Sequence, residues 1–599
     1  ADALARALDL DVRVVEALLG APRHFAWIAR HVSAEEAAAV RALRLPGIDV
    51  TAEPRRYYPG KSSGGPLLGV AGIDGKGLDG VELAMEDLLT GQRASFAALR
   101  DATGGTMMSQ GLVDATPGAT VTLTIDRAIQ AIADQALAAA VTKHQARAGS
   151  VVVLDVATSK VLAMASWPTY DPNGPDATPG APGPAEPARN RAITDVFEIG
   201  SVMKIFTVAG ALESGTVRPT DIVDAEGGKY QVGRKTIRDT HRDFELTIGD
   251  VLKRSSNVAA VKLAQRMGRD TLYRTLKAFG FGDATGIELP GEQPGLVRNP
   301  AKWGEIGLAT VAFGYGLTVT PLQISAALAA VANGGLYQEP RLIEQITVEQ
   351  DGRTKTVFQH RATMRQVISG QTAAELLPML ESVFDKGKKG GTAKGIEIEG
   401  YRSGGKTGTA HKIDPHGGGY SDKLYLGSFA GIAPIDAPRI VVVVVIDEPH
   451  GADYFGAKVA GPVFAEVAGE TLRYLGVPRS APRLGDEVGA TADDRAGEED
   501  EPTPAAAGVG VEPAPAPGST EAEAPALVPL PDGAALVPDF AGMGVAEAIE
   551  LARDRGLRIE IEGSGRGVAQ VPPPGPAALW SEVRVVFARA GSGEPTARR

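Results

Sequence analysis

The chain has 599 residues, 43% of them hydrophobic, which favours several domains with ordinary cores. Its formal net charge of −12, without any basic run, argues against a nucleic-acid-binding protein. There are 0 cysteines, which excludes thiol catalysis, disulfides and zinc–cysteine sites, and the 8 histidines show no metal-ligand spacing, so we expect neither metal nor cofactor.

Residues 1 to 117 predict a mixed region with two short helices. Ala34 to Leu43 has an amphipathic pattern, and Ser33 and Glu36 have the spacing of a capping box at its start. Glu82 to Leu89 predicts the second helix. No apolar run in the chain approaches ~18 residues, so the sequence contains no predicted membrane-spanning helix.

The character of the sequence changes at about Gly118. Val121 to Asp126 alternates like a strand and runs into a predicted helix from Arg127 to Val141, with Asp126 placed to cap it. Ser150 to Leu154 and Val161 to Ala165 predict a β-hairpin. Asn173 to Glu186 is rich in proline and glycine, which predicts a loop.

The centre of the chain is mostly helical, and strands return towards residue 478. The sequence predicts helices from Pro321 to Asn333 and from Val459 to Leu475. Between them it predicts three strands: Lys406 to Ala410, Leu424 to Pro434 and Arg439 to Ile446. Strands at both ends of residues 118–478 with helices between them indicate an α+β fold, with one mainly antiparallel sheet flanked by helices.

The C-terminal part divides into a linker and a small unit. Residues 479–534 are acidic and rich in proline and alanine, a composition that cannot bury a core, so we expect a disordered linker. Residues 535–589 predict a compact α/β unit with a helix from Val545 to Arg555 and strands at Leu557 to Ile561 and Val583 to Phe587.

The stretch Phe197 to Lys204 contains the pattern Ser-x-x-Lys and enters an apolar helix. Positions i and i+3 share a helix face, so Ser201 and Lys204 should lie side by side at the helix start. A serine hydroxyl becomes a nucleophile when a neighbouring base takes its proton, and a desolvated lysine can be that base. The alternative is that Ser201 caps the helix and Lys204 reaches its surface.

Two further motifs favour the catalytic interpretation. Ser255-Ser256-Asn257 gives Ser-x-Asn, and Lys406-Thr407-Gly408-Thr409 gives Lys-Thr-Gly. Ser-x-x-Lys, Ser-x-Asn and Lys-Thr-Gly in this order form the signature of penicillin-binding proteins and class A β-lactamases. The residues around the motifs are Phe-Glu-Ile-Gly-Ser-Val-Met-Lys, Arg-Ser-Ser-Asn-Val and Gly-Lys-Thr-Gly-Thr-Ala. With them, the chain resembles a class B penicillin-binding protein, a peptidoglycan D,D-transpeptidase of the cell-division type.

The resemblance implies roles for the first group of site residues. Ser201 would be the nucleophile and Lys204 the base, and Lys406 and Ser255 would complete a hydrogen-bonded cluster with them. A second cation beside Lys204 would help to keep one lysine neutral. Ser255 would carry a proton to the leaving amine.

The remaining motif residues would bind substrate. Asn257 would hold a peptide backbone with its amide, and Thr407, Thr409 and Lys406 would bind a terminal carboxylate. Gly408 would let substrate approach the strand closely. The backbone N–H groups of Ser201 and Thr409 would form the oxyanion hole. Taken singly, Ser255 and Asn257 could instead form a turn, and Lys406 to Thr409 an ordinary strand end.

Three neighbouring side chains receive structural interpretations. Glu198 is expected to stabilise the start of the Ser201 helix, and His411 and His416 to be exposed loop residues. Ser256 stands where class A β-lactamases usually carry aspartate, and no candidate for their second-step glutamate is evident. Both points disfavour an efficient hydrolase.

The resemblance also implies fold, modules and partners. It implies the β-lactamase-like transpeptidase fold for residues 118–478. Arg-Tyr-Tyr-Pro at 56–59 and Gly-Leu-Asp-Gly-Val-Glu at 77–82 resemble the pedestal domain of the dimerisation type, which implies a partial domain of this kind for 1–117. Val-Pro-Asp-Phe at 537–540, the helix, Gly-Leu at 556–557 and Pro-Pro-Pro-Gly at 572–575 resemble a single PASTA domain, which residues 535–589 would form. That PASTA domain either binds wall fragments or is a surface module. Expected partners are peptidoglycan stem peptides, β-lactams, a membrane glycosyltransferase and other cell-division proteins.

The expected location is the inner membrane, with the catalytic part in the periplasm. Family members carry an N-terminal anchor, which we expect to be missing from this chain, because it begins with Ala1 and contains no targeting segment. Two alternatives to the transpeptidase remain. One is a D,D-carboxypeptidase or β-lactamase on the same scaffold, and the other is a non-catalytic β-lactam sensor or divisome scaffold.

Overall fold

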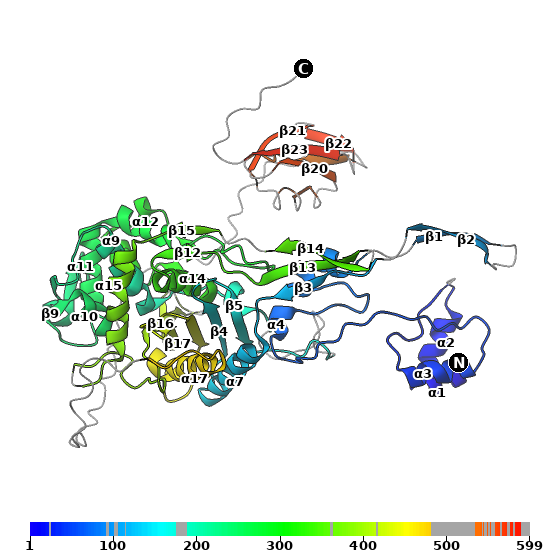
Figure 1. Ribbon diagram of the computed structural model, residues 1–599, viewed down its shortest axis with the longest axis horizontal. Coiled ribbons are helices and arrows are strands. Elements are labelled where there is room, and N and C mark those ends of the chain that lie inside the picture. The colour runs from blue at the N-terminus through cyan, green and yellow to red at the C-terminus, as the bar shows by residue number, and fades with distance from the viewer. Residues whose placement is uncertain are drawn as a thin grey trace. The chain divides into compact units, whose positions relative to one another are not determined.

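The computed structural model describes most of the chain as two compact units, Ala1–Ala514 and Pro515–Arg599, and each is considered by itself (Figure 1). The described residues of the first unit are 1–22, 25–91, 95–100, 106–113, 116–174, 188–350, 352–359, 363–387, 389–414, 417 and 419–480. Those of the second unit are 534–541, 543, 548, 551–552, 558–563, 566–571, 575–578 and 582–588.

Three helices open the first unit: α1 (Asp2–Ala7), α2 (Val12–Gly20) and α3 (Ala34–Ala42). They bury a small core of their own around Leu4, Val15 and Val40. The predicted capping box of α3 is confirmed. Ser33 Oγ accepts from the N–H of Glu36 at 3.1 Å, and the Glu36 carboxylate accepts from the N–H of Ser33 at 2.7 Å.

A connecting region follows with α4 (Gly65–Leu68), α5 (Gly80–Ala84), α6 (Glu86–Leu89) and the hairpin β1 (Ser95–Arg100) and β2 (Thr106–Val113). The single helix predicted for Glu82 to Leu89 is wrong, because the chain leaves helical geometry at Met85 (φ −111°, ψ 14°) and forms two short helices. This region is tied to the helix α7 (Arg127–Lys143) by Asp134, whose carboxylate accepts from Ser63 Oγ at 2.7 Å and from the N–H of Gly64 at 3.1 Å.

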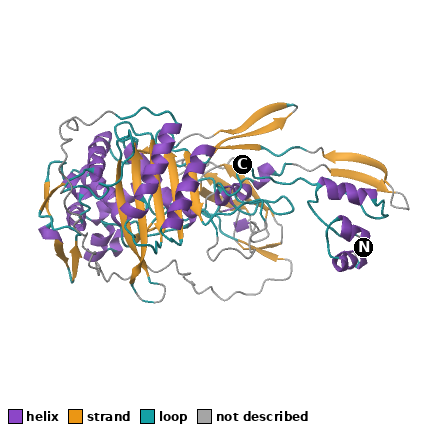
Figure 2. Cartoon of the chain, turned by 90° about the horizontal axis from the view of Figure 1, so that it is seen from below, coloured by secondary structure: helices purple, strands orange, loops and turns teal. Residues whose placement is uncertain are grey.

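A five-stranded antiparallel sheet forms the centre of the first unit, in the spatial order β16-β17-β18-β4-β5. Its strands are β4 (Ala148–Asp155), β5 (Val161–Trp167), β16 (Gly404–Ile413), β17 (Tyr420–Ala433) and β18 (Ile440–Asp447). All five strands were predicted, and each is confirmed with slightly different ends. β4, from the N-terminal part of the sheet region, thus pairs with β18 from its C-terminal part, and β16 and β5 are the two edge strands. Figure 2 shows the sheet with helices lying across it.

Helices cover both faces of this sheet. α7 (Arg127–Lys143) and α17 (Gly461–Tyr474) pack against each other on one face, and α14 (Pro321–Ala332) lies across the other. Asp126 caps α7 as predicted, with its carboxylate accepting from the N–H of Ala128 at 2.8 Å. The closing helix predicted roughly from Val459 to Leu475 is confirmed as α17, and a separate short helix, α16 (Gly456–Val459), precedes it.

The predicted helical centre is confirmed. It contains α8 (Arg191–Thr194), the 3₁₀ helix η2 (Gly200–Met203), α9 (Lys204–Glu213), α10 (Ile248–Lys253), α11 (Asn257–Met267), α12 (Arg269–Ala278), η4 (Pro300–Lys302), α13 (Glu305–Val311), α15 (Gly370–Glu381) and η5 (Ser382–Phe384). α9 is buried almost entirely, packing its Phe206 ring against Phe279 and Phe281. Across the described part of the chain, every helix falls short of the length and apolarity that a membrane crossing requires.

Short strands complete the first unit. β3 (Thr120–Leu123), β13 (Ile343–Gln350) and β14 (Arg353–Gln359) form a second sheet in the order β14-β13-β3. Two-stranded pairs join β6 (Ile222–Asp224) to β9 (Glu245–Thr247), β7 (Lys229–Val232) to β8 (Lys235–Arg238), β10 (Leu296–Val297) to β11 (Leu317–Thr318), and β12 (Leu336–Gln338) to β15 (Met364–Gln366). A further 3₁₀ turn is η3 (Glu226–Gly228).

The second unit is described only in part. β20 (Arg558–Gly563) pairs in parallel with β23 (Glu582–Ala588), β21 (Arg566–Val571) joins β23 in antiparallel fashion, and β19 (Ala534–Val537) pairs with β22 (Gly575–Ala578). Phe540, Ala548, Ala552 and Val583 belong to its small core. Both predicted strands are confirmed. The predicted linker lies almost wholly, and the helix predicted from Val545 mostly, outside the described residues.

Candidate active site

The Ser201 turn is held by glycines. Gly200 has φ +58°, a left-handed conformation that favours glycine, and its N–H donates to the carbonyl of Gly314 at 3.1 Å. A Cβ on Gly314 would lie 2.1 Å from the carbonyl oxygen of Gly200. Ser201 lies inside the 3₁₀ helix η2 rather than capping an α-helix as one alternative held, and Lys204 begins α9.

The first two motifs meet at the ammonium group of Lys204. Its Nζ donates to Ser201 Oγ at 3.1 Å, to Ser255 Oγ at 3.1 Å and to the carbonyl of Ser255 at 2.5 Å. Ser255 reaches this group because its backbone is left-handed, with φ +57°, which is uncommon for a residue with a side chain. The predicted pairing of Ser201 with Lys204 is confirmed, and the surface position considered for Lys204 is wrong, because this side chain is 0% exposed.

Burial changes the proton affinity of both motif lysines. It lowers the pKa of Lys204 to about 7, against an opposing influence of the negative charge of Asp239. Burial, and then the charge of Lys204, lower the pKa of Lys406 well below its ordinary value. The charge of Lys204 thus acts on Lys406, whereas burial and Asp239 set the pKa of Lys204. That Lys406 helps to keep Lys204 neutral stays a prediction. A lysine with a pKa near 7 is neutral in a large fraction of molecules at neutral pH, so it can accept a proton from Ser201.

Lys406 joins this cluster electrostatically, and its hydrogen bonds run elsewhere. Its Nζ donates to the carbonyl of Thr407 at 3.2 Å and to Thr407 Oγ1 at 3.4 Å. Thr407 Oγ1 in turn donates to Thr392 Oγ1 at 3.0 Å. The hydroxyl of Thr409 accepts from the N–H of Gly456 at 3.0 Å. These threonine hydroxyls are thus oriented by the protein.

Gly408 is required by packing. A Cβ at this position would lie 2.3 Å from Ser428 Oγ and 3.0 Å from Val202 Cγ2. The missing side chain therefore makes room for the Ser201 turn and for the neighbouring strand β17. The close approach of substrate expected at Gly408 stays a prediction.

Asn257 begins α11 behind Ser256, which caps that helix. Its side-chain Nδ2 donates to the carbonyl of Arg238 at 2.8 Å. One N–H of the Asn257 amide is thus engaged within the protein, and its second N–H and its oxygen are the groups left for a peptide backbone, so the expected substrate contact stays a prediction. The amide oxygen remains the group suited to a peptide N–H.

Sequence analysis missed Asp239. Its half-buried carboxylate accepts from Ser256 Oγ at 2.5 Å, from the N–H of Asn257 at 2.5 Å and from the N–H of Val258 at 3.0 Å. Burial raises its pKa against these hydrogen bonds and the charge of Lys204. Asp239 follows β8 and shows no motif spacing, so the one available signal was Ser256 standing where related enzymes carry aspartate. The carboxylate at this place comes from another segment.

Glu198 is buried and structural, as expected, and accepts from the N–H of Gly316 at 2.7 Å and from the hydroxyl of Tyr420 at 3.0 Å. His411 differs from its interpretation. His411 belongs to β16 instead of an exposed loop, with its Nδ1 2.9 Å from the carbonyl of Ser421. His416 lies outside the described residues.

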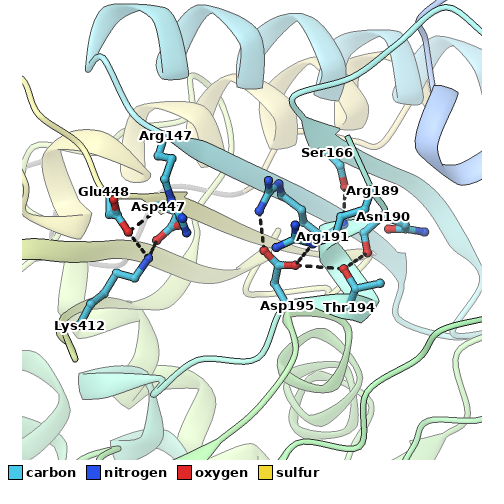
Figure 3. A network of polar contacts seen from close by, with 10 residues as sticks. All are labelled: Arg147, Ser166, Arg189, Asn190, Arg191, Thr194, Asp195, Lys412, Asp447 and Glu448. Atoms are coloured by element: carbon cyan, nitrogen blue, oxygen red, sulfur yellow. Dashed lines mark hydrogen bonds and ion pairs between the residues drawn. The ribbon is translucent and has the colours of Figure 1, made fainter. Parts of the chain in front are cut away.

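A cavity of about 270 Å³ is lined in part by residues of β4, β16, β17 and β18 and by none of the motif residues. Figure 3 shows the network of charged side chains that borders it. On one side Asp447 pairs with Arg147 at 2.6 Å and with Lys412 at 2.7 Å. On the other side Asp195 accepts from Arg191 at 2.7 Å and from Arg189 at 2.7 Å. This second group fixes the chain where it turns towards Ser201.

Two family profiles match the chain. The penicillin binding protein transpeptidase domain matches residues 149–469, and the penicillin-binding protein dimerisation domain matches residues 20–123. The first match includes all three motifs, and the second covers much of the region predicted as a pedestal.

Curated relatives and solved structures agree with these profiles. The chain is 37% identical to the peptidoglycan D,D-transpeptidase FtsI of Escherichia coli (strain K12) over 487 residues, 81% of this chain and 79% of the relative. It is 35% identical to the probable peptidoglycan D,D-transpeptidase PenA of Neisseria gonorrhoeae, covering 77% of this chain and 75% of that protein. The crystal structure of penicillin binding protein 3 from Mycobacterium tuberculosis is similar with a TM-score of 0.63 and 32% identity, over 72% of this chain and 92% of the other.

Proposed function

The chain belongs to the penicillin-binding protein transpeptidases and is a serine-type peptidoglycan D,D-transpeptidase, and from that premise we propose that Ser201 is its nucleophile. The supporting observation is the contact of Ser201 Oγ with the buried Nζ of Lys204 at 3.1 Å. A lysine whose pKa is lowered to about 7 is matched to proton transfer at neutral pH.

The first half-reaction forms an acyl-enzyme. Neutral Lys204 takes the Oγ proton as Ser201 attacks the carbonyl of the penultimate D-alanine in a stem peptide. The backbone N–H groups of Ser201 and Thr409 stabilise the oxyanion, and losing one such donor typically costs about 10²–10³ in rate. Collapse of the tetrahedral intermediate releases D-alanine, whose amine receives the proton from Lys204 through Ser255.

The second half-reaction makes the cross-link. An amine of a neighbouring stem peptide attacks the acyl carbonyl and loses its proton to the same lysine–serine cluster. Ser201 Oγ then leaves and is reprotonated. Lys406 lies beside this cluster, and its lowered pKa reflects burial and the charge that Lys204 carries when it holds the proton.

Substrate binding falls to the edge strand β16 and to the start of α11. Lys406, Thr407 and Thr409 present a cation and two oriented hydroxyls for the terminal carboxylate. The amide oxygen of Asn257 accepts a peptide N–H. β16 lies at the free edge of the sheet, which suits an extended peptide laid alongside it.

Intact-protein mass after incubation with benzylpenicillin tests the nucleophile. The parent should gain the mass of one drug molecule and keep it, and Ser201→Ala should gain none. A mass gain in Ser201→Ala would remove Ser201 from its role. Rapid loss of the adduct with continuing drug turnover would identify a β-lactamase, and trimmed instead of cross-linked stem peptides would identify a carboxypeptidase.

The finer assignments of the modules belong to this proposal as well. We assign residues 1–117 to a pedestal, 118–478 to the catalytic domain, 479–534 to a linker and 535–589 to a PASTA domain. Support for the last comes from Val-Pro-Asp-Phe at 537–540 and the parallel pair β20–β23. The enzyme works outside the cytoplasm in septal wall synthesis beside a membrane glycosyltransferase, a place supported by its likeness to FtsI.

A further inference from the structure

The segment from Asp195 to Gly200 carries the chain into the nucleophile turn and is fastened at several points. Asp195 is held by two arginines at its start (Figure 3). Phe197 exchanges backbone hydrogen bonds with Val319 at 3.0 and 3.1 Å, and Gly200 donates to Gly314. Between these points stands Glu198, three residues before Ser201 and only 8% exposed.

Glu198 connects the segment to two other pieces of chain. One carboxylate oxygen accepts from the N–H of Gly316 at 2.7 Å and from the hydroxyl of Tyr420 at 3.0 Å. Gly316 belongs to the same turn as Gly314, which receives the hydrogen bond of Gly200. Tyr420 is the first residue of β17, the strand that pairs with β16 along the Lys-Thr-Gly motif.

The turn between Glu198 and β16 makes a second connection of the same kind. The hydroxyl of Tyr315 accepts from the N–H of His411 at 3.2 Å, two residues beyond Thr409 on β16. The ring of Tyr315 also packs edge-on against Tyr420, with ring centroids 5.3 Å apart. Hydrogen bonds and ring packing around the Glu198 carboxylate therefore connect three segments: the nucleophile turn, the 314–316 turn and the β16–β17 hairpin.

Burial of the Glu198 carboxylate carries a desolvation cost. Burying a carboxylate disfavours its charged form, and burial accordingly raises the pKa of Glu198. The nearby charge of Arg298 opposes that effect, as do the two hydrogen bonds. An apolar side chain would fill the same space without the desolvation cost, but it would leave the N–H of Gly316 and the hydroxyl of Tyr420 without this acceptor.

We propose that Glu198 is a positioning residue for the acylation step: it sets the distance between the Ser201 turn and the β16 strand, and thereby between nucleophile and oxyanion hole. Both proposed oxyanion donors, Ser201 and Thr409, lie on the two pieces that Glu198 joins. The inference rests on the proposed role of Ser201. Displacing reacting groups by about 1 Å can cost roughly 10²-fold in rate.

Stopped-flow acylation by benzylpenicillin separates initial binding from the acylation rate constant. Glu198→Ala should lower the rate constant by roughly 10²-fold and change the initial dissociation constant much less. Glu198→Gln keeps a carbonyl oxygen as acceptor and should stay within about threefold of the parent. Tyr420→Phe removes one of two donors and should cost about three- to tenfold. Glu397→Gln, at an exposed ion pair with Lys386, is the matched control and should not change the rate.

Each further outcome has a defined meaning. Acylation of Glu198→Ala at the parent rate would overturn the positioning role, while loss of acylation in Ser201→Ala would leave the proposed nucleophile intact. Failure of Glu198→Gln with a shifted pH profile would replace positioning with a requirement for negative charge. If Glu198→Ala does not fold, Glu198→Gln and Tyr420→Phe still decide, because equal rate losses in both would contradict the acceptor role.

Discussion

Ser256 Oγ donates a 2.5 Å hydrogen bond to the carboxylate of Asp239, and through it the Ser-x-Asn motif is fastened to a segment that carries no motif. The same carboxylate accepts the first N–H groups of α11, where a helix N-terminus favours negative charge. Its charge also raises the pKa of Lys204. Asp239 therefore acts on both the geometry and the proton affinity of the site.

Asp239→Asn should shift the pH dependence of acylation. Removing the negative charge leaves the pKa of Lys204 lower than its present value of about 7, because burial then acts unopposed by this carboxylate. The acidic midpoint of the acylation rate should move to lower pH, with a lower plateau from the disturbed hydrogen bonds. Acylation rates of parent and variant from about pH 5 to about pH 9 check this. An unchanged midpoint would mean that Asp239 has only a structural role.

The parent itself should lose acylation activity as the pH falls through about 7, the value to which burial lowers the pKa of Lys204. The neutral amine is the reactive form, so the rate should fall about tenfold per pH unit below that point. The measurement is the second-order rate constant with benzylpenicillin at constant ionic strength. A rate independent of pH down to about 5 would argue against Lys204 as the base.

Gly408→Ala should impair both stability and acylation, because the new Cβ would lie 2.3 Å from Ser428 Oγ. Overpacking of this kind costs about 1–3 kcal/mol in the free energy of unfolding. The double variant Gly408→Ala with Ser428→Ala removes the colliding oxygen and should recover part of the loss, as measured by thermal unfolding and acylation rate. Equal behaviour of the single and double variants would show that the clash lies elsewhere, with Val202 Cγ2 at 3.0 Å and the carbonyl oxygen of Ile199 at 3.2 Å as the remaining neighbours.

Asp134 should make the attachment of the connecting region sensitive to pH. Burial raises its pKa from 3.8 to about 6, so the folded state holds a proton that the unfolded chain releases at lower pH. The stability from this group is complete below pH 3.8 and is lost as the pH rises through about 6. Asp134→Asn lacks this loss, so its free energy of unfolding should gain on the parent by roughly 1–3 kcal/mol between about pH 4 and about pH 6.

Urea unfolding at three pH values across that window, with intrinsic fluorescence as the probe, measures the difference. Asp87→Asn, at an exposed acidic residue of α6, serves as the control. Its free energy of unfolding should change with pH in parallel with that of the parent. A constant difference between Asp134→Asn and the parent would show that Asp134 does not titrate in this range.

Local sequence features were sufficient to predict many helices and strands and the residues of the three motifs. The starts of α3 and α7 were predicted from their caps, Ser33 with Glu36 in α3 and Asp126 in α7. This was possible because a capping side chain bonds to the backbone only two or three residues away. Apolar runs predicted β4, β5 and β18, and β4 and β18 are buried along their whole length. The helix predicted from Glu82 to Leu89 is interrupted at Met85, and no proline or glycine in that stretch indicated the interruption.

The sequence by itself determined the order of the three motifs and, through the i, i+3 spacing, the contact of Ser201 with Lys204. Only the tertiary structure decided that Asp239 supports Ser256, that Glu198 meets Tyr420, and that Gly408 makes room for Val202. The physical reason is range. Helical periodicity and capping act within one or two turns, whereas these three relationships join segments whose separation along the chain leaves no periodic trace and whose meeting depends on the packing of the whole sheet.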